Sequence, residues 1–425
     1  MTENNTKAIL VGIAKRSSEL SEVEKSLDEL ERLFDTAGGT ECVRVIQIKD
    51  SYDPRTLIGS GKVLEISELV KNLGIDLIIF DEELTPAQIR NLENDIGDVS
   101  VIDRSMLILD IFAKHAVSGE GKLQVELAQL KYSAPRLVGK GATLSRQGGG
   151  IGSRGPGESK LETDRRHVHE KIVNLEARLR ELEHNRSVMR QQRDKSGLAK
   201  ISLVGYTNAG KSTILNYLTG AGVLSEDKLF ATLDPTTRKL LLPCGETVLL
   251  TDTVGFIRKL PHHLVKAFKS TLDEVSYADI LVIVADVNDP ELLEHIEVTK
   301  NVITELSASD KPTVIAYNKA DLNDELDKSV LSDYFCYVSG KTGEGVDRLL
   351  YLIEKAIHEK KKELEVLVPY TEQGALNQIY KEYTVLETEY RDDGVYARVI
   401  FDEKAIGQYK KYLLNFSFDK EKEDE

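Results

Sequence analysis

Residues 205–212 read GYTNAGKS and complete the pattern GxxxxGK[ST]. The pattern follows a short apolar run, ISLV, and precedes a helix-like run, TILNYLTG. A strand, a glycine-rich turn and a helix N-terminus in this order surround a phosphate chain with backbone N–H groups. The feature predicts a P-loop nucleotide-binding domain of the α/β class. It assigns Lys211 to the β- and γ-phosphates and Ser212 to Mg²⁺.

Three later motifs narrow the nucleotide. DTVG at 252–255 follows the apolar run TVLL, so that Asp252 is expected to hold the metal through water and the Gly255 N–H to meet the γ-phosphate. NKAD at 318–321 ends the run TVIAY, and the Asp321 carboxylate can accept hydrogen bonds that guanine donates and adenine cannot. SGK at 339–341 fits the loop that completes a base pocket. The four motifs together predict a guanine-nucleotide-binding domain.

Three features of the site stay open from the residues alone. The stretch FATLDPTTR, residues 230–238, offers three threonines that could sense Mg²⁺ and the γ-phosphate, and the residues do not choose among them. Phe256 follows DTVG where a Ras-like GTPase has a water-orienting glutamine, so hydrolysis must depend on something else. Asn208 either helps to ligate a monovalent cation such as K⁺ or caps the loop through a hydrogen bond.

The spacing of apolar residues divides the whole chain into four expected regions. Residues 1–116 alternate apolar runs with amphipathic stretches, which predicts an N-terminal α/β domain with a parallel sheet. Residues 117–197 predict a coiled-coil helical arm of about 50 Å, because apolar residues recur at helical and heptad spacing. Residues 198–363 form the expected G domain, and residues 364–425 read as a small α+β domain.

A basic, glycine-rich loop is expected at the tip of the arm, at 139–157. It has eight glycines in nineteen residues, three cations and no acid. The formal net charge is −15, yet residues 131–195 hold fifteen Lys/Arg and eight Asp/Glu, a net of +7. A flexible linker fits the composition equally well, but the place on a rigid arm favours RNA contact. The expected RNA-binding residues are Arg146, Gly148, Gly149, Gly150, Arg154, Lys160, Arg165 and Arg166.

These residues together resemble the HflX family of GTPases, relatives of the Obg group. The similar segments are GYTNAGKS, FATLDPTTR, DTVGFI, NKAD, SGKTGEG, YDPRTLIGSGKV and RQGGGIGSRGPGESKLETDRR. The resemblance implies a GTP hydrolase that binds the 50S ribosomal subunit and reaches toward the ribosomal RNA of the peptidyl-transferase region. It implies that the GTP form splits stalled or idle ribosomes under stress. It also matches Phe256 to the hydrophobic replacement of glutamine in that family, and Gly340 to a position where alanine is usual.

The resemblance places Thr232 at the second metal position, so Ser212 and Thr232 are the expected Mg²⁺ ligands and Lys211, Ser212, Thr232 and Gly255 the expected catalytic residues. The expected GTP contacts are Gly205, Tyr206, Thr207, Asn208, Ala209, Gly210, Lys211, Ser212, Phe230, Ala231, Thr232, Leu233, Asp234, Asp252, Thr253, Val254, Gly255, Asn318, Lys319, Ala320, Asp321, Ser339, Gly340 and Lys341. Three scattered cysteines and the lack of a long apolar run favour a cytoplasmic protein. A monomer is expected.

Two alternatives of other classes remain at this point. The chain could be an RNA-binding assembly or storage factor of the large subunit, for which GTP is an occupancy signal and no ribosome is split. The N-terminal α/β domain could also bind a second nucleotide at its strand ends, although it has no complete phosphate motif.

Overall fold

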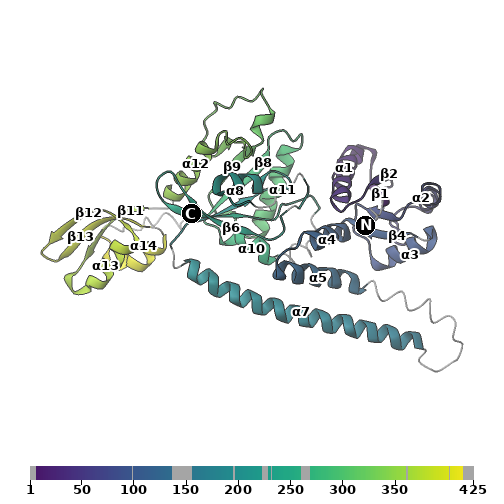
Figure 1. Cartoon of the computed structure of the whole chain (residues 1–425), viewed down its shortest axis with the longest axis horizontal. Helices are drawn as coiled ribbons and strands as arrows, with labels where there is room; N and C mark the ends of the chain where they lie inside the picture. The colour runs from purple at the N-terminus through teal and green to yellow at the C-terminus, as the bar shows by residue number, and fades with distance from the viewer. Residues whose placement is uncertain are drawn as a thin grey trace, which may run out of the picture.

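The computed structural model describes residues 6–97, 99–135, 156–194, 197–222, 228–230, 232–259, 269–359, 362–401 and 403–414. Three sheets and a long helix organise these residues (Figure 1). The predicted α/β architecture with a P-loop domain is confirmed. The boundaries expected at 116, 197 and 363 stay predictions. None of the described helices is both long and apolar enough to cross a membrane.

The N-terminal domain is a four-stranded parallel sheet in the order β2-β1-β3-β4. Helix α1 buries one apolar stripe, with Val23, Leu27 and Leu30 at a spacing of three or four residues, against this sheet. The GSGK segment, residues 59–62, supplies the N-cap and the first turn of α2. The elements are β1 (Lys7–Ala14), α1 (Leu20–Thr36), β2 (Glu41–Ile48), α2 (Ser60–Leu73), β3 (Leu77–Phe80), α3 (Pro86–Ile96), β4 (Ser100–Asp103) and α4 (Arg104–His115).

Two helices, α5 (Gly119–Ser133) and α7 (Pro156–Asp194), occupy the region of the expected arm, and its coiled-coil character stays a prediction. At 1.5 Å per residue, the 39 residues of α7 span about 58 Å. The shorter helix α5 packs on α7, and ion pairs join the two, including Lys131–Glu176 at 2.7 Å. The arm is therefore a helical hairpin with one short and one long member, which Figure 1 shows alongside the two larger domains.

The G domain has a six-stranded sheet in the order β10-β9-β8-β5-β7-β6, with only β6 antiparallel to its neighbour. Its central strand β8 is buried along almost its whole length, as expected for a sheet covered on both faces. The elements are β5 (Lys200–Val204), α8 (Lys211–Thr219), β6 (Thr236–Leu241), β7 (Thr247–Asp252), α10 (Lys269–Tyr277), β8 (Ile280–Asp286), α11 (Leu292–Glu305), β9 (Thr313–Asn318), β10 (Phe335–Tyr337) and α12 (Val346–Glu359).

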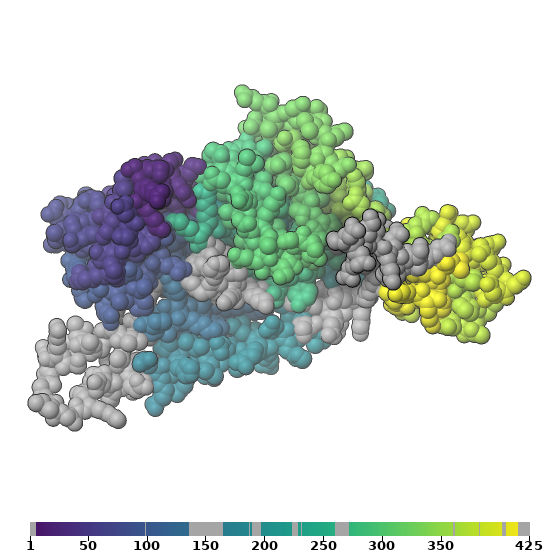
Figure 2. Space-filling view, turned by 180° about the vertical axis from the view of Figure 1, so that it is seen from behind, coloured from purple at the N-terminus to yellow at the C-terminus, as the bar shows by residue number. Residues whose placement is uncertain are grey.

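The N-terminal domain and the G domain share one apolar core. A single buried cluster joins side chains of α1 and α4 with residues of the P-loop and of the two segments that follow α8 and β7. The G-domain members of this cluster are Tyr206, Leu229, Phe230, Leu233, Val254 and Ile257. The space-filling view shows the two domains in direct contact, with the C-terminal domain projecting at one end (Figure 2).

The C-terminal domain is a three-stranded antiparallel sheet in the order β11-β13-β12, with helices on one side. Strands β12 and β13 form a hairpin that turns at Asp392 and Asp393, before Gly394. The elements are β11 (Lys362–Val368), α13 (Gln373–Glu382), β12 (Thr384–Arg391), β13 (Gly394–Phe401) and α14 (Glu403–Tyr409). Short 3-10 turns lie at Ser17–Glu19, Ala320–Leu322, Tyr370–Glu372 and Lys410–Tyr412.

Candidate nucleotide-binding site

The P-loop joins β5 to α8, and two of its glycines are required by close backbone contacts. Gly205 has φ +149°, and a Cβ there would lie 2.1 Å from the Val284 carbonyl oxygen. Gly210 has φ +90°, and a Cβ there would lie 2.2 Å from Nδ2 of Asn318. Any other residue would displace a neighbouring strand end or the base-pocket asparagine. The loop is thereby held in the shape that aims backbone N–H groups at one point.

The Lys211 side chain is almost fully buried in this loop. Its Nζ donates to the carbonyl oxygens of Gly205, at 3.1 Å, and Tyr206, at 2.9 Å. Burial lowers the pKa of Lys211 to about 8, while the nearby Asp252 carboxylate acts in the opposite direction. The ammonium group is poorly solvated, so a phosphate oxygen would be a strong partner for it.

Three oxygen-bearing side chains converge beside the loop. Ser212 Oγ donates to Asp252 Oδ2 at 2.6 Å and lies 2.8 Å from Thr232 Oγ1. The other Asp252 oxygen, Oδ1, is buried and has no hydrogen-bond partner among the described residues. Burial raises the pKa of Asp252, opposed by Lys211 and by hydrogen bonds from the two hydroxyls. Hydroxyl and carboxylate oxygens suit Mg²⁺, so this set fits the ion that GTPases of this fold use.

Gly255, in the segment that follows β7, lies against Thr207 and Lys211 of the P-loop. Its Cβ, if present, would lie 2.8 Å from Thr207 Cα and 3.0 Å from Lys211 Nζ. The adjacent backbone ties DTVG to the P-loop, because Phe256 N–H donates to Gly205 O at 3.0 Å and Thr207 N–H donates to Phe256 O at 2.8 Å. The Phe256 ring is fully buried in the G-domain core. It offers no polar atom with which to orient water.

The base-pocket motifs meet at the ends of β9 and β10. Asn318 Nδ2 donates to the carbonyl of Ala209 at 2.8 Å, and Asn318 Oδ1 accepts from Gly340 N–H at 3.0 Å. This asparagine therefore connects the P-loop with the SGK loop. A Cβ at Gly340 would lie 3.0 Å from Ile214, a tight contact that accounts for glycine here. Asp321 is half-buried in the short Ala320–Leu322 turn, beside Asn318.

The structure brings most of the expected GTP-contact residues that it describes to one edge of the sheet, but several of their side chains turn away from the P-loop, among them Leu233, which is buried with residues of α4 and α5. The Tyr206 hydroxyl donates to Glu29 of α1, the Phe230 ring packs edge-on against Phe112 of α4, and Asp234 is bonded to the start of α5. These side chains turn toward the N-terminal domain and the arm, so their contact with GTP stays a prediction that only their backbone groups could fulfil in this arrangement. The reason is chemical: an aromatic ring gains by burial, and a carboxylate beside a polyphosphate would be repelled.

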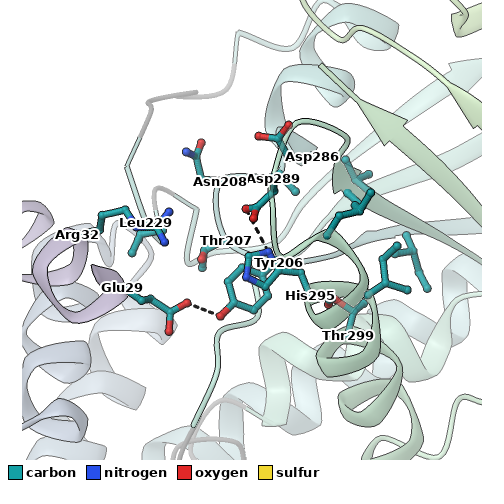
Figure 3. Close-up of a pocket in the computed structure, with 16 residues that line it drawn as sticks. Glu29, Arg32, Tyr206, Thr207, Asn208, Leu229, Asp286, Asp289, His295 and Thr299 are labelled. Carbon is teal, nitrogen blue, oxygen red and sulfur yellow. Dashed lines mark hydrogen bonds and ion pairs between the residues drawn. The ribbon is translucent and has the colours of Figure 1, made fainter. Parts of the chain in front are cut away.

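Tyr206 of the P-loop lies between Glu29 of α1 and His295 of α11 (Figure 3). Its hydroxyl also accepts the Arg258 N–H at 2.8 Å, and its ring stacks on His295 at 3.7 Å between centroids. The His295 Nδ1 lies 3.2 Å from Asp289, whose pKa is lowered chiefly by that hydrogen bond. Burial and the Glu29 charge raise the pKa of the Tyr206 hydroxyl, so it remains a neutral donor.

A buried charge network continues from Glu29 into the N-terminal domain. Arg104 is 2% exposed and pairs with Glu29 and with Asp81, the latter at 2.7 Å. Lys259, just after β7, reaches Asp81 at 2.6 Å and Glu82 at 2.7 Å. Burial alone would raise the pKa of Asp81, but Arg104 and Lys259 hold it below its usual value. Sequence motifs gave no signal for this network, nor for His295 or Ser118.

Part of the predicted site cannot be placed. Ala231, Arg146, Gly148, Gly149, Gly150 and Arg154 lie outside the described residues, and the structure describes no side chain for Lys160. Arg165 and Arg166 are exposed on α7, in its half nearer the loop.

The fold and the site define a P-loop GTPase with an N-terminal domain docked on its nucleotide loops. Three family models match in succession, described as GTP-binding GTPase N-terminal (residues 24–113), GTP-binding GTPase Middle Region (115–193) and 50S ribosome-binding GTPase (200–319). The chain belongs to the HflX family of GTPases and is a GTP hydrolase.

Two relatives show the extent of the match. The chain is 49% identical to the GTPase HflX of Lacrimispora saccharolytica, over 93% of this chain and 93% of that protein. It is 47% identical to the GTPase HflX of Caldanaerobacter subterraneus, over 98% and 95%. A solved GTP-binding protein from Sulfolobus solfataricus, in complex with GDP, aligns with TM-score 0.43 and 24% identity over 83% of this chain and 99% of that one.

Proposed function

We propose that this GTPase binds the 50S ribosomal subunit and, in its GTP state, dissociates stalled or idle ribosomes under stress. The observation that carries the proposal is a G domain whose switch residues Phe230 and Leu233 pack against α5, which in turn packs on the long helix α7. The matched description of the G domain as a 50S ribosome-binding GTPase supports it. The protein acts in this proposal as a cytoplasmic monomer.

The proposal gives each residue of the nucleotide site a role, which the positions of Lys211, Ser212, Thr232 and Asp252 support. Lys211 neutralises charge on the phosphates, and the P-loop N–H groups donate to them. Ser212 and Thr232 would hold Mg²⁺ with Asp252 nearby, and the ion would supply charge stabilisation to the phosphates. Gly255 lets the backbone N–H reach the γ-phosphate. Asp321 accepts hydrogen bonds from guanine.

Hydrolysis in this proposal depends on the partner. The buried Phe256 cannot orient water, so a ribosomal group completes the site, and a K⁺ ion near Asn208 would supply part of the missing charge. The arm presents its glycine-rich loop, including Arg146 and Arg154, to ribosomal RNA of the peptidyl-transferase region. Because each neutralised phosphate releases counterions, attachment should weaken with salt.

The test mixes the protein and GTP with purified 70S ribosomes and monitors their dissociation into subunits by light scattering. Lys211→Ala should abolish splitting, and deletion of 148–155 should spare basal hydrolysis while losing splitting. A matched pair of charge variants locates the contact: Arg165→Ala/Arg166→Ala near the tip should weaken 50S binding and its salt dependence, whereas Arg178→Ala/Arg180→Ala, both exposed and farther along α7, should not. Normal splitting by the loop deletion would contradict the role of the arm.

Nucleotide-dependent binding to 50S particles without dissociation of 70S ribosomes would instead favour an assembly or storage factor.

A further inference from the structure

The segment after α8 is bonded to the first turn of the arm. Asp234 Oδ2 accepts from the Ser118 N–H at 2.7 Å and from the Val117 N–H at 3.1 Å, and its Oδ1 accepts from the Ser118 hydroxyl. Ser118 is the N-cap of α5, and its Oγ accepts from Gly121 N–H at 2.8 Å. Asp234 therefore extends the cap of α5 with a full negative charge, which the helix N-terminus favours.

Apolar contacts fasten the same segment to the same place. Phe230 and Leu233 are almost fully buried, among Phe112 of α4 and Val125 of α5. The Phe230 and Phe112 rings meet edge to face at 4.7 Å. Phe230 has φ +57°, a conformation that costs an aromatic residue energy, and the packing holds it there. The chain is thus anchored on both sides of Thr232.

The Thr232 side chain points away from α5, toward the side chains of Ser212 and Asp252 at the expected Mg²⁺ site. Its hydroxyl lies 2.8 Å from Ser212 Oγ while Asp234 holds α5. Two residues span at most about 7 Å, so Thr232 cannot withdraw far from the metal position without pulling on Asp234. The two contacts are mechanically coupled.

The coupling continues into the long helix. Glu120, in the first turn of α5, pairs with Arg186 of α7 at 2.6 Å. The first turn of α5 therefore contacts the nucleotide segment on one side and α7 on the other. A shift of that turn would therefore move the part of α7 around Arg186.

We infer that Asp234 is a positioning residue that holds Thr232 at the metal and makes the first turn of α5 respond to the γ-phosphate. The inference rests on GTP binding at this site but not on any action at the ribosome. Because binding free energies are reciprocal, a contact that favours the Mg²⁺–GTP state must itself be strengthened by Mg²⁺–GTP. Asp234 then links nucleotide state to the arm in both directions.

The chain offers a matched pair of glycines for the test. A Cβ at Gly121 would lie 2.5 Å from Asp234 Oδ1, whereas a Cβ at Gly119 would meet nothing within 4 Å. Gly121→Ala and Gly119→Ala both add alanine to the same first turn, and only the first intrudes on Asp234. Asp234→Asn keeps the shape and replaces one acceptor oxygen with a donor.

The measured quantity is the ratio of affinities for a non-hydrolysable GTP analogue and for GDP, in the full chain with Mg²⁺. We expect the ratio to fall about tenfold, equivalent to about 1.4 kcal/mol, in Asp234→Asn and Gly121→Ala. Gly119→Ala should keep the wild-type ratio. An unchanged ratio in both Asp234→Asn and Gly121→Ala would overturn the inference, as would an equal fall in Gly119→Ala.

Amide hydrogen exchange measures the reciprocal effect, that of the bound nucleotide on the contact between Asp234 and α5. In the wild-type chain the amides of Val117 and Ser118 should exchange more slowly with the GTP analogue than with GDP, and Asp234→Asn should remove that difference. Equal protection with both nucleotides in the wild type would also overturn the inference. If Asp234→Asn fails to fold, Gly121→Ala decides. Neither assay contains ribosomes, so failure here is distinct from failure of the proposed function.

Discussion

Tyr206→Phe removes one oxygen from the contact between the P-loop and the N-terminal domain. The hydroxyl donates to the buried Glu29 carboxylate and accepts from the Arg258 N–H at 2.8 Å. A hydrogen bond to a charged group contributes about 1.5–3 kcal/mol and a neutral one about 0.5–1.5 kcal/mol, so the loss should be roughly 2–4 kcal/mol. The ring keeps its stacking on His295, so the change is confined to the two hydrogen bonds.

Amide hydrogen exchange measures this loss locally. If Tyr206 holds α1 against the G domain, exchange in α1 should accelerate by roughly 30- to 1,000-fold, since about 1.4 kcal/mol is a factor of ten. Tyr390→Phe is the control, because Tyr390 is 76% exposed on β12 and should change exchange there by less than about twofold. Exchange in α1 within about threefold of the wild type would refute the reasoning.

Two further predictions concern charge. The pKa of Lys211 is lowered to about 8 by burial, and bound phosphates should restore its proton; nucleotide affinity should therefore be full below pH 8 and fall by up to about tenfold per pH unit above it. Titration calorimetry in buffers of different ionisation enthalpy should detect proton uptake on binding at pH 8–9, and no uptake would contradict a lowered pKa. Arg104→Met should destabilise the N-terminal domain by about 3–5 kcal/mol, because it removes the cation that pairs with the buried Glu29 and leaves Asp81 with Lys259 alone. Adding Glu29→Gln should recover part of this loss in denaturant unfolding; no recovery would mean that the charge of Glu29 is not the cause.

The motifs of the nucleotide site could be predicted because each acts through local geometry. Gly205 and Gly210 are needed for backbone conformation. Lys211 and Ser212 begin α8 after the loop that follows β5, and Asp252 ends β7, the parallel neighbour of β5. The strand order of the sheet then brings separate motifs together at one edge. The same reasoning predicted the parallel sheet of the N-terminal domain from its alternating pattern.

The contacts between domains could not be predicted, because they join residues far apart in the sequence. Glu29 meets Tyr206 and Asp234 meets Ser118 through tertiary packing, and neither pair forms a pattern along the chain. One signal was available: Phe230 and Leu233 are large apolar residues in a stretch that is expected to contact the nucleotide. Such a residue has more to gain from burial than from contact with phosphates.

The rate of GTP hydrolysis by the full chain, alone and with purified 50S subunits at matched magnesium and potassium, tests the central claim most directly. Phe256 is buried at the position where Ras-like GTPases have a water-orienting glutamine, so the protein alone should hydrolyse GTP slowly. Hydrolysis should accelerate at least about tenfold with 50S subunits, equivalent to about 1.4 kcal/mol off the barrier. An unchanged rate at saturating 50S would contradict a ribosome-completed active site.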